Sequence, residues 1–167
     1  MDAPKVRVGF IGSGGNARYH MGLMLSLPEV HIVAIADPNP AMIEAAHKQY
    51  PPLSGVPAFD NYKDMLSSVR MDAVLISTPH TLHKEHILAA LDAGLHVLCE
   101  KPLVCTVADA KEVIARLEQS GKVGVLSYQR HYQPEFRYIR SRLEKGDLGA
   151  VTFINALQCQ NWKNGTQ

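Results

Sequence analysis

The fold is decided by the stretch Val6-Arg7-Val8-Gly9-Phe10-Ile11-Gly12-Ser13-Gly14-Gly15-Asn16-Ala17. Its first half is rich in β-forming residues and predicts a strand over residues 6–11. Its second half has the form G-x-G-x-x-A, in which Gly12 would permit a tight turn, Gly14 the close approach of a pyrophosphate, and Ala17 close packing of a helix on the sheet. A helix over residues 15–27 would point its positive N-terminal end at the phosphates. The stretch predicts a dinucleotide site whose loop consists of Gly12, Ser13, Gly14, Gly15 and Asn16.

An acidic residue stands where such a site needs one, at the end of the next strand. Residues 30–36 are an apolar run typical of a parallel strand covered on both faces, and Asp37 follows directly. An acid at this point accepts hydrogen bonds from an adenosine ribose, and its charge would repel a 2′-phosphate. NAD is therefore favoured over NADP, although a cation such as Lys5 or Arg18 could soften that preference. In the alternative interpretation, Asp37 only caps the helix that starts at Asn39-Pro40.

Strand-like and helix-like segments alternate along the first 128 residues. Strict alternation with short links predicts an α/β fold, a doubly wound parallel Rossmann sheet. The expected strands are residues 6–11, 30–36, 56–59, 73–77, 96–99 and 123–127. The expected helices are residues 15–27, 40–50, 62–68, 82–93 and a segment that Thr106 caps and that ends at Gly121.

Composition excludes several classes of protein. The chain has 167 residues, of which 46% are hydrophobic and 20% charged, and its net charge of +1 gives no reason to expect a nucleic-acid partner. Cys99, Cys105 and Cys159 form no Cys-x-x-Cys pair, which argues against a disulfide framework and a zinc site and favours a reducing cytoplasm. No signal segment and no run long enough to cross a bilayer is present, so no membrane partner is expected.

A second polar group, Ser77-Thr78-Pro79-His80-Thr81-Leu82-His83, follows the strand expected over residues 73–77. Thr78 and Pro79 should lie at the carboxyl edge of the sheet, beside the ribose and pyrophosphate of a cofactor. His83 is predicted to line the cofactor pocket, and His86 to be an ordinary, partly buried histidine. Neither a helical His-x-x-x-His pair nor a nearby cysteine completes a metal site here, so no metal is predicted.

A third group, Glu100-Lys101-Pro102, leaves the apolar run at residues 96–99. A parallel strand in an open α/β sheet points its carboxyl end at the ligand crevice, so Lys101 should face whatever is bound there. Pro102 biases Lys101 toward an extended backbone. Taken alone the tripeptide is typical of a surface turn, and its place in the expected fold is what favours a site.

The character of the chain changes after Ser127. Residues 128–134 are polar and aromatic and predict a segment that crosses between domains. A helix over residues 136–145 should turn Ile139 and Leu143 inward, and a strand is expected over residues 150–158. The predicted domains are thus residues 1–128, a nucleotide-binding domain, and residues 129–167, the beginning of an incomplete second domain. The strand has no partner in the rest of the sequence, so the chain is expected to be cut off just after this domain begins.

Four segments together resemble the Gfo/Idh/MocA family, the oxidoreductases similar to glucose–fructose oxidoreductase and inositol 2-dehydrogenase. They are Gly9-Phe10-Ile11-Gly12-Ser13-Gly14, Ala36-Asp37-Pro38-Asn39-Pro40, Ser77-Thr78-Pro79-His80-Thr81-Leu82-His83 and His96-Val97-Leu98-Cys99-Glu100-Lys101-Pro102. The resemblance extends from residue 5 to about residue 154. It implies an N-terminal Rossmann domain, a C-terminal α+β domain with an open, mainly antiparallel sheet, and NAD(P)-dependent oxidation of a sugar, polyol or related alcohol.

The resemblance also implies roles for individual residues. Lys101 would be the catalytic residue, reaching the substrate and the nicotinamide ribose and assisting proton movement during hydride transfer. Glu100 would contact the cofactor or orient Lys101, and Pro102 would hold the turn, for which a cis bond is one available geometry. Gln129 would reach the nicotinamide, as would Arg130 unless it serves a structural ion pair. Trp162 is a further candidate at the edge of the site.

One expected feature of the family is absent. Its members carry an aspartate and a histidine, three to four residues apart in the second domain, and no such pair follows Trp162 before the last residue, Gln167. The 167-residue chain is therefore expected to bind NAD without turning over substrate, and a full-length parent to be a homo-oligomeric dehydrogenase. Two other functions remain open: a non-catalytic dinucleotide-binding module, and a domain similar to S-adenosylmethionine-dependent methyltransferases, which would not need Lys101.

Overall fold

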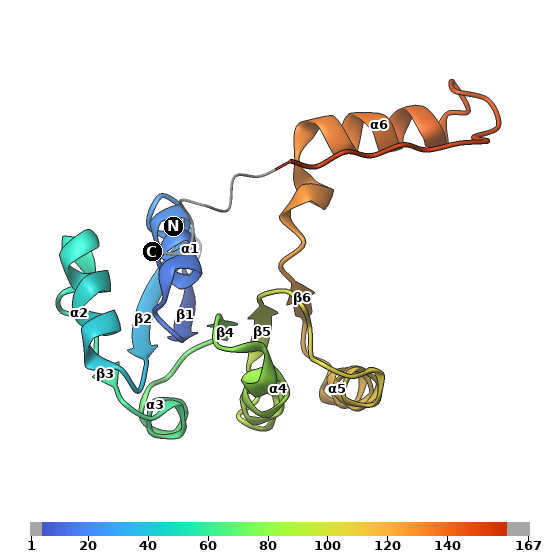
Figure 1. Cartoon of the computed structure of the whole chain (residues 1–167). Helices are drawn as coiled ribbons and strands as arrows, with labels where there is room; N and C mark the ends of the chain where they lie inside the picture. Colours follow the sequence, from blue (N-terminus) through green and yellow to red (C-terminus); the bar gives the residue numbers. More distant parts are fainter. Residues whose placement is uncertain (1–4, 160–167) are drawn as a thin grey trace. The chain divides into compact units, whose positions relative to one another are not determined.

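The computed structural model describes residues 5–159, and the chain divides after Tyr128 into two units. The first unit is built on a six-stranded sheet in the order β3-β2-β1-β4-β5-β6, with every neighbouring pair parallel (Figure 1). The strands are β1 Val6–Ile11, β2 Val30–Ala36, β3 Ala58–Phe59, β4 Ala73–Ile76, β5 His96–Cys99 and β6 Gly124–Leu126. This confirms the predicted doubly wound parallel sheet.

The strand order places a topological switch point beside β1. The chain builds outward from β1 to β3, returns to the other side of β1 at β4, and continues outward to β6. In open α/β sheets ligands bind outside the carboxyl ends of the strands at such a point. The glycine loop after β1 and the Thr-Pro segment after β4 therefore lie at the same edge of the sheet.

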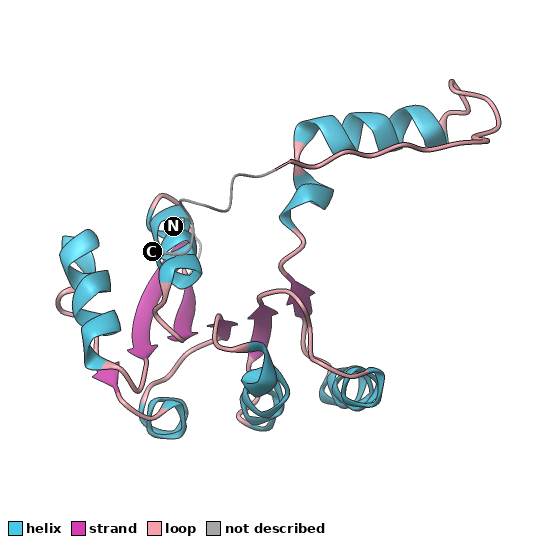
Figure 2. Cartoon of the chain, viewed as in Figure 1, coloured by secondary structure: helices cyan, strands magenta, loops and turns pink. Residues whose placement is uncertain are grey.

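Helices cover both faces of the sheet (Figure 2). The helices of the first unit are α1 Gly15–Leu25, α2 Pro40–Gln49, α3 Tyr62–Ser68, α4 His83–Asp92 and α5 Val107–Ser120. Successive strand residues point to opposite faces, so Phe10 packs with Met21 of α1 and Ala46 of α2, whereas Ile11 belongs to the cluster that includes Ile87 of α4. The central strands bury side chains on both faces, which explains their continuous apolar sequence.

Polar caps set where the helices start. Asn39 accepts a hydrogen bond from the Ala41 N–H at the start of α2, and Thr106 accepts one from the Asp109 N–H at the start of α5, as the sequence predicts. Asn61 caps α3 in the same way. None of the helices in the described part of the chain has the length and apolar character needed to cross a membrane.

The second unit contains a short 3-10 turn at Gln129–Tyr132 and helix α6, Pro134–Glu144. It differs from its prediction in the exposure of two helix residues and in the strand expected after the helix. Ile139 and Leu143 are 49% and 41% exposed rather than turned into a core. Residues 151–159 form no strand, so the strand expected over residues 150–158 is wrong. A strand is stable only beside neighbours that pair with it, and the described residues of this unit supply no such neighbour.

Candidate functional site

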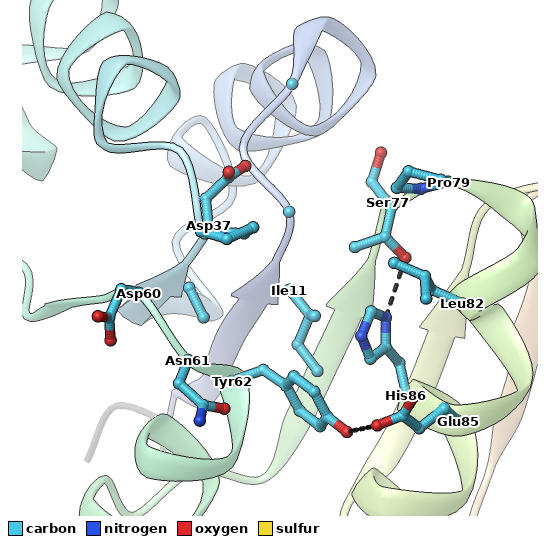
Figure 3. A pocket seen from close by; sticks show the side chains of 15 residues that line it. Ile11, Asp37, Asp60, Asn61, Tyr62, Ser77, Pro79, Leu82, Glu85 and His86 are labelled. Atoms are coloured by element: carbon cyan, nitrogen blue, oxygen red, sulfur yellow. Dashed lines mark hydrogen bonds between the residues drawn. The ribbon is translucent and has the colours of Figure 1, made fainter.

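A cavity of about 710 Å³ lies at the switch point of the sheet (Figure 3). Its walls come from the segments that follow β1, β2, β3 and β4 and from the first turn of α4. The predicted residues that it brings together are Gly12, Gly14, Asp37, Thr78 and Pro79. The other lining residues are Ile11, Ala36, Pro38, Asp60, Asn61, Tyr62, Ser77, Leu82, Glu85 and His86.

The glycine loop has the geometry that its sequence suggests. Gly12 has a φ of 93°, and a Cβ placed on it would lie 2.3 Å from the Ser77 carbonyl oxygen, so only glycine fits between the ends of β1 and β4. A Cβ on Gly14 would meet nothing within 4 Å, so space beside this residue is open. Gly15 and Asn16 form the exposed first turn of α1, where helical N–H groups have no partner within the helix. This turn suits a pyrophosphate.

Asp37 is fixed at the cavity wall by three hydrogen bonds. Its Oδ2 accepts the Ser13 N–H at 2.8 Å and the Ser13 hydroxyl at 2.9 Å, and its Oδ1 accepts the Asn39 N–H at 2.9 Å. Ser13 is fully buried and does not line the cavity. A carboxylate has about four acceptor positions, so Asp37 can contribute to the start of α2 and still accept a ribose hydroxyl.

The opposite wall is a chain of polar contacts that joins three elements. The Tyr62 hydroxyl donates to Glu85 Oε1 at 2.5 Å, and the Tyr62 ring meets His86 edge-on with 4.4 Å between centroids. His86 Nδ1 lies 3.0 Å from Thr78 Oγ1 (Figure 3). Burial, and then the hydrogen bond to Glu85, raises the pKa of Tyr62, whereas burial lowers the pKa of His86.

Apart from Thr78, sequence reasoning missed this wall. His86 was predicted to be an ordinary partly buried histidine, yet it lines the cavity. Asp60, Asn61 and Tyr62 directly follow β3, and residues at the carboxyl end of a parallel strand share an edge with the other loops. That rule could have identified them.

His83 takes a different place from the one predicted. Its side chain is fully buried and is not among the residues that line the cavity. Nδ1 lies 2.8 Å from the Pro102 carbonyl oxygen and Nε2 lies 3.0 Å from the Thr78 carbonyl oxygen. Because its ring nitrogens face the carbonyls of Thr78 and Pro102, His83 lies between the segment that follows β4 and the segment that follows β5.

Glu100 is also buried, with 5% of its surface exposed, and does not line the cavity. Its Oε1 lies 2.7 Å from His20 Nε2, its Oε2 accepts the Lys101 N–H at 3.2 Å, and Ser127 gives a further hydrogen bond. Burial alone would raise the pKa of Glu100, but these three hydrogen bonds hold it below its ordinary value. A direct contact between Glu100 and a cofactor does not follow from this geometry.

Lys101 follows Glu100 as an exposed residue at the carboxyl end of β5, and the Lys101-Pro102 peptide bond is cis.

The contact of His20 with Glu100 was not predicted from the sequence. Helical spacing places His20 on the inward face of α1 with Ala17 and Met21. A polar residue on an apolar helix face was the available signal.

The remaining predicted residues lie elsewhere. Gln129 and Arg130 belong to the second unit, and a role at the nicotinamide stays a prediction for both. Trp162 lies outside the described residues. Among residues 5–159, no group of three or more His, Cys, Asp or Glu side chains is arranged to hold a metal ion.

Comparison with known proteins decides the family. Residues 6–128 match the Gfo/Idh/MocA oxidoreductases, a family with an NAD-binding Rossmann fold. The chain belongs to this family. Inositol 2-dehydrogenase of Corynebacterium glutamicum is 30% identical over 154 residues, a match that covers 91% of the chain and 45% of that enzyme. D-glucoside 3-dehydrogenase of Escherichia coli is 30% identical over 157 residues, which cover 93% of the chain and 44% of that enzyme. The chain thus spans less than half the length of these Gfo/Idh/MocA relatives.

Solved Gfo/Idh/MocA structures agree with the fold. Scyllo-inositol dehydrogenase from Lactobacillus casei, with bound NAD(H) and scyllo-inositol, superimposes with a TM-score of 0.82 at 25% identity. The superposition covers 89% of this chain and 43% of the Lactobacillus casei chain. A putative dehydrogenase from Bordetella bronchiseptica RB50 gives a TM-score of 0.79 at 34% identity, covering 89% of this chain and 38% of that one.

Proposed function

We propose that the first unit binds NAD and forms the cofactor half of a dehydrogenase that oxidises a sugar, polyol or related alcohol. The observation that carries this proposal is the cavity at the switch point, where Gly12 and Gly14 leave room for a pyrophosphate and Asp37 offers a carboxylate to a ribose. The polyol class is supported by family membership and by the inositol and glucoside dehydrogenases among the relatives.

Each part of the site has a proposed task. The first turn of α1 binds the pyrophosphate, with Gly12, Gly14, Gly15 and Asn16 in contact and Ser13 fixing Asp37. Asp37 accepts a hydroxyl of the adenosine ribose and favours NAD over NADP, because a 2′-phosphate would meet its negative charge. Thr78 and Pro79 lie beside the ribose and pyrophosphate, supported from beneath by His83.

Lys101 is the proposed catalytic residue. NAD, when bound, accepts the hydride that leaves the substrate carbon, and the hydroxyl proton of the substrate must then be removed. Lys101 stands at the carboxyl end of β5, on the edge of the sheet that carries the cavity, and assists the movement of that proton. Gln129 is a proposed contact to the nicotinamide. A cytoplasmic, homo-oligomeric protein is also proposed.

Calorimetric titration of the chain tests the cofactor. We expect NAD to bind more tightly than both NADP and S-adenosylmethionine. Tighter binding of S-adenosylmethionine would favour a methyltransferase-like domain instead. The same measurement with Ser67→Ala, a change at an exposed position of α3 outside the cavity, should leave the affinity for NAD unchanged.

The variant Lys101→Met tests the chemistry. With a complete substrate domain present, we expect it to bind NAD within about twofold of wild type and to lose at least about 100-fold in kcat, the range typical for loss of an acid/base group. Reduction of NAD by inositol, followed by absorbance, measures turnover. If the wild type with a complete substrate domain binds NAD but reduces none with any polyol, the first unit is better described as part of a dinucleotide-binding module.

A further inference from the structure

Two buried histidines support the segment Glu100-Lys101-Pro102 from beneath. His20 comes from α1 and contacts the Glu100 side chain at 2.7 Å, while His83 begins α4 and contacts the Pro102 carbonyl at 2.8 Å. We infer that His20 and His83 are positioning residues that fix the backbone of Lys101, and that His20 ties Lys101 to the helix that receives the phosphates. The inference rests on the proposed function, in which Lys101 acts on the substrate.

The contact between His20 and Glu100 is the first arm of this support. An ionised carboxylate buried without partners is strongly unfavourable, and the hydrogen bonds to Glu100 keep its pKa low, so it stays ionised. An ionised carboxylate only accepts, so the His20 Nε2 atom carries the proton and donates. The other oxygen, Oε2, accepts the Lys101 N–H. Glu100 therefore uses its charge to hold the backbone of its neighbour.

This arm joins two parts of the site that are far apart in sequence. His20 and Glu100 are separated by 80 positions. His20 lies about 1.4 helical turns after Gly15, the first residue of α1. A helix is rigid over that length, so a phosphate that orders the first turn of α1 also orders the residue that holds Glu100. NAD binding and the placement of Lys101 thereby share one element.

His83 is the second arm. Both of its ring nitrogens face backbone carbonyl oxygens, which only accept hydrogen bonds. An imidazole with one N–H donates to only one of these oxygens, and the shorter contact, 2.8 Å from Nδ1 to Pro102, places the proton on Nδ1; Nε2 lies 3.0 Å from the Thr78 oxygen. His83 is fully buried, so water does not compete for these contacts. The residue after Lys101 is thereby tied to the start of α4.

Matched amide substitutions test the His20 arm. The amide nitrogen of Gln can replace Nε2 of His20, whereas the shorter Asn cannot reach Glu100. Hydrogen exchange of the residue 101 backbone amide, followed by NMR on the whole chain, is the measurement. We expect exchange about tenfold faster in His20→Asn, the loss of roughly one good hydrogen bond, and within about twofold of wild type in His20→Gln. If His20→Asn does not fold, Glu100→Gln replaces it, because it removes the charge and keeps the shape.

The same logic reverses at His83. Asn places its amide nitrogen near Nδ1, where it can donate to the Pro102 carbonyl, whereas Gln places it near Nε2, where it can donate to the Thr78 carbonyl but not to Pro102. We expect His83→Asn to preserve slow exchange at residue 101 and His83→Gln to speed it about tenfold. The Phe10 amide in β1 reports global unfolding and should change by less than about twofold in every variant that supports the inference.

Two results would overturn the inference. The first is an exchange rate at residue 101 that does not change in His20→Asn. The second is an equal increase of that rate in the Asn and Gln variants of the same histidine. A turnover measurement separates this inference from the proposed function. With the substrate domain present, His20→Asn should lower kcat about tenfold and change the KM for NAD by less than about threefold, and His20→Gln should restore kcat. If Lys101→Met left turnover intact, the proposed chemistry would fail, while the exchange data would still decide whether the two histidines fix the segment.

Discussion

Asp37 contributes to the start of α2 and is also the proposed acceptor of a ribose hydroxyl. Its three hydrogen bonds to Ser13 and Asn39 fix its rotamer and contribute to the start of α2, and the carboxylate still borders the cavity. The two interpretations that the sequence left open, a ribose acceptor and a helix cap, are therefore compatible. Ser13 is part of this arrangement, since its buried hydroxyl and N–H both donate to the same oxygen.

We expect Asp37→Ala to reduce the preference for NAD over NADP by about tenfold. The variant loses a charged acceptor for the ribose and the repulsion of a 2′-phosphate, an effect of one good hydrogen bond or more. Calorimetric titration with both nucleotides gives the ratio. Ser13→Ala, which removes one donor to Asp37 and keeps its charge, is the control and should change the ratio less. An unaltered ratio in Asp37→Ala would remove the ribose contact from the proposal.

His86 should make the stability of the fold depend on pH. Burial lowers its pKa in the folded chain, so the unfolded chain binds a proton at a higher pH than the folded chain. Stability is then complete above the ordinary histidine value and falls as the pH drops below about 6.5 toward the lowered pKa. In His86→Asn, which keeps an amide near Nδ1, we expect the decrease in Tm between pH 7 and pH 5 to be smaller by about 2–4 °C. Equal slopes in thermal unfolding by circular dichroism would contradict this.

Elements were predictable where their partners lie within the chain. The run at Val30–Ala36 is apolar except for the exposed His31, because β2 lies between β1 and β3 with helices on both faces. Its sequence alone predicted a parallel strand covered on both faces. The same pattern failed for residues 150–158, because an apolar stretch becomes a strand only when another strand pairs with it. The prediction that Ile139 and Leu143 face inward was wrong for the same reason. An apolar stripe on a helix indicates burial only when another part of the protein covers it.

The candidate site follows the same division. Gly12 and Asp37 were predictable because a local motif carries them, and both line the cavity. Tyr62 and His86 depend on which strand ends share an edge, which is a property of sheet order. The link between His20 and Glu100 spans 80 positions, so no local pattern contains it.

The turn between β1 and α1 should tolerate no side chain at Gly12. Its φ of 93° and the Ser77 carbonyl 2.3 Å from an added Cβ mean that Gly12→Ala must move the ends of β1 or β4. We expect a loss of about 1–3 kcal/mol in unfolding free energy and loss of NAD binding. Chemical denaturation and calorimetry measure the two effects. Gly55→Ala, where an added Cβ meets nothing within 4 Å, is the matched control and should leave both near wild type.

At the scale of the whole molecule, every residue among 5–159 that lines the cavity precedes Tyr128, the last residue of the first unit. Three partners of Glu100, namely His20, the Lys101 N–H and Ser127, also belong to that unit. The two hydrophobic clusters on the faces of the sheet draw their residues from it as well. The first unit therefore contains the six-stranded sheet, both hydrophobic clusters and the cavity.

A chain that ends at Tyr128 should consequently fold and bind NAD with a Kd within about threefold of the 167-residue chain. A threefold change corresponds to about 0.6 kcal/mol, less than the loss of one average hydrogen bond. Thermal unfolding and calorimetry compare the two chains, and Gln129→Ala in the longer chain is the matched variant. If truncation and Gln129→Ala both weaken NAD by tenfold or more, Gln129 completes the cofactor site, as the family resemblance implies. If truncation alone does so, other residues of the second unit contribute to the affinity, and the first unit is not sufficient to bind the cofactor.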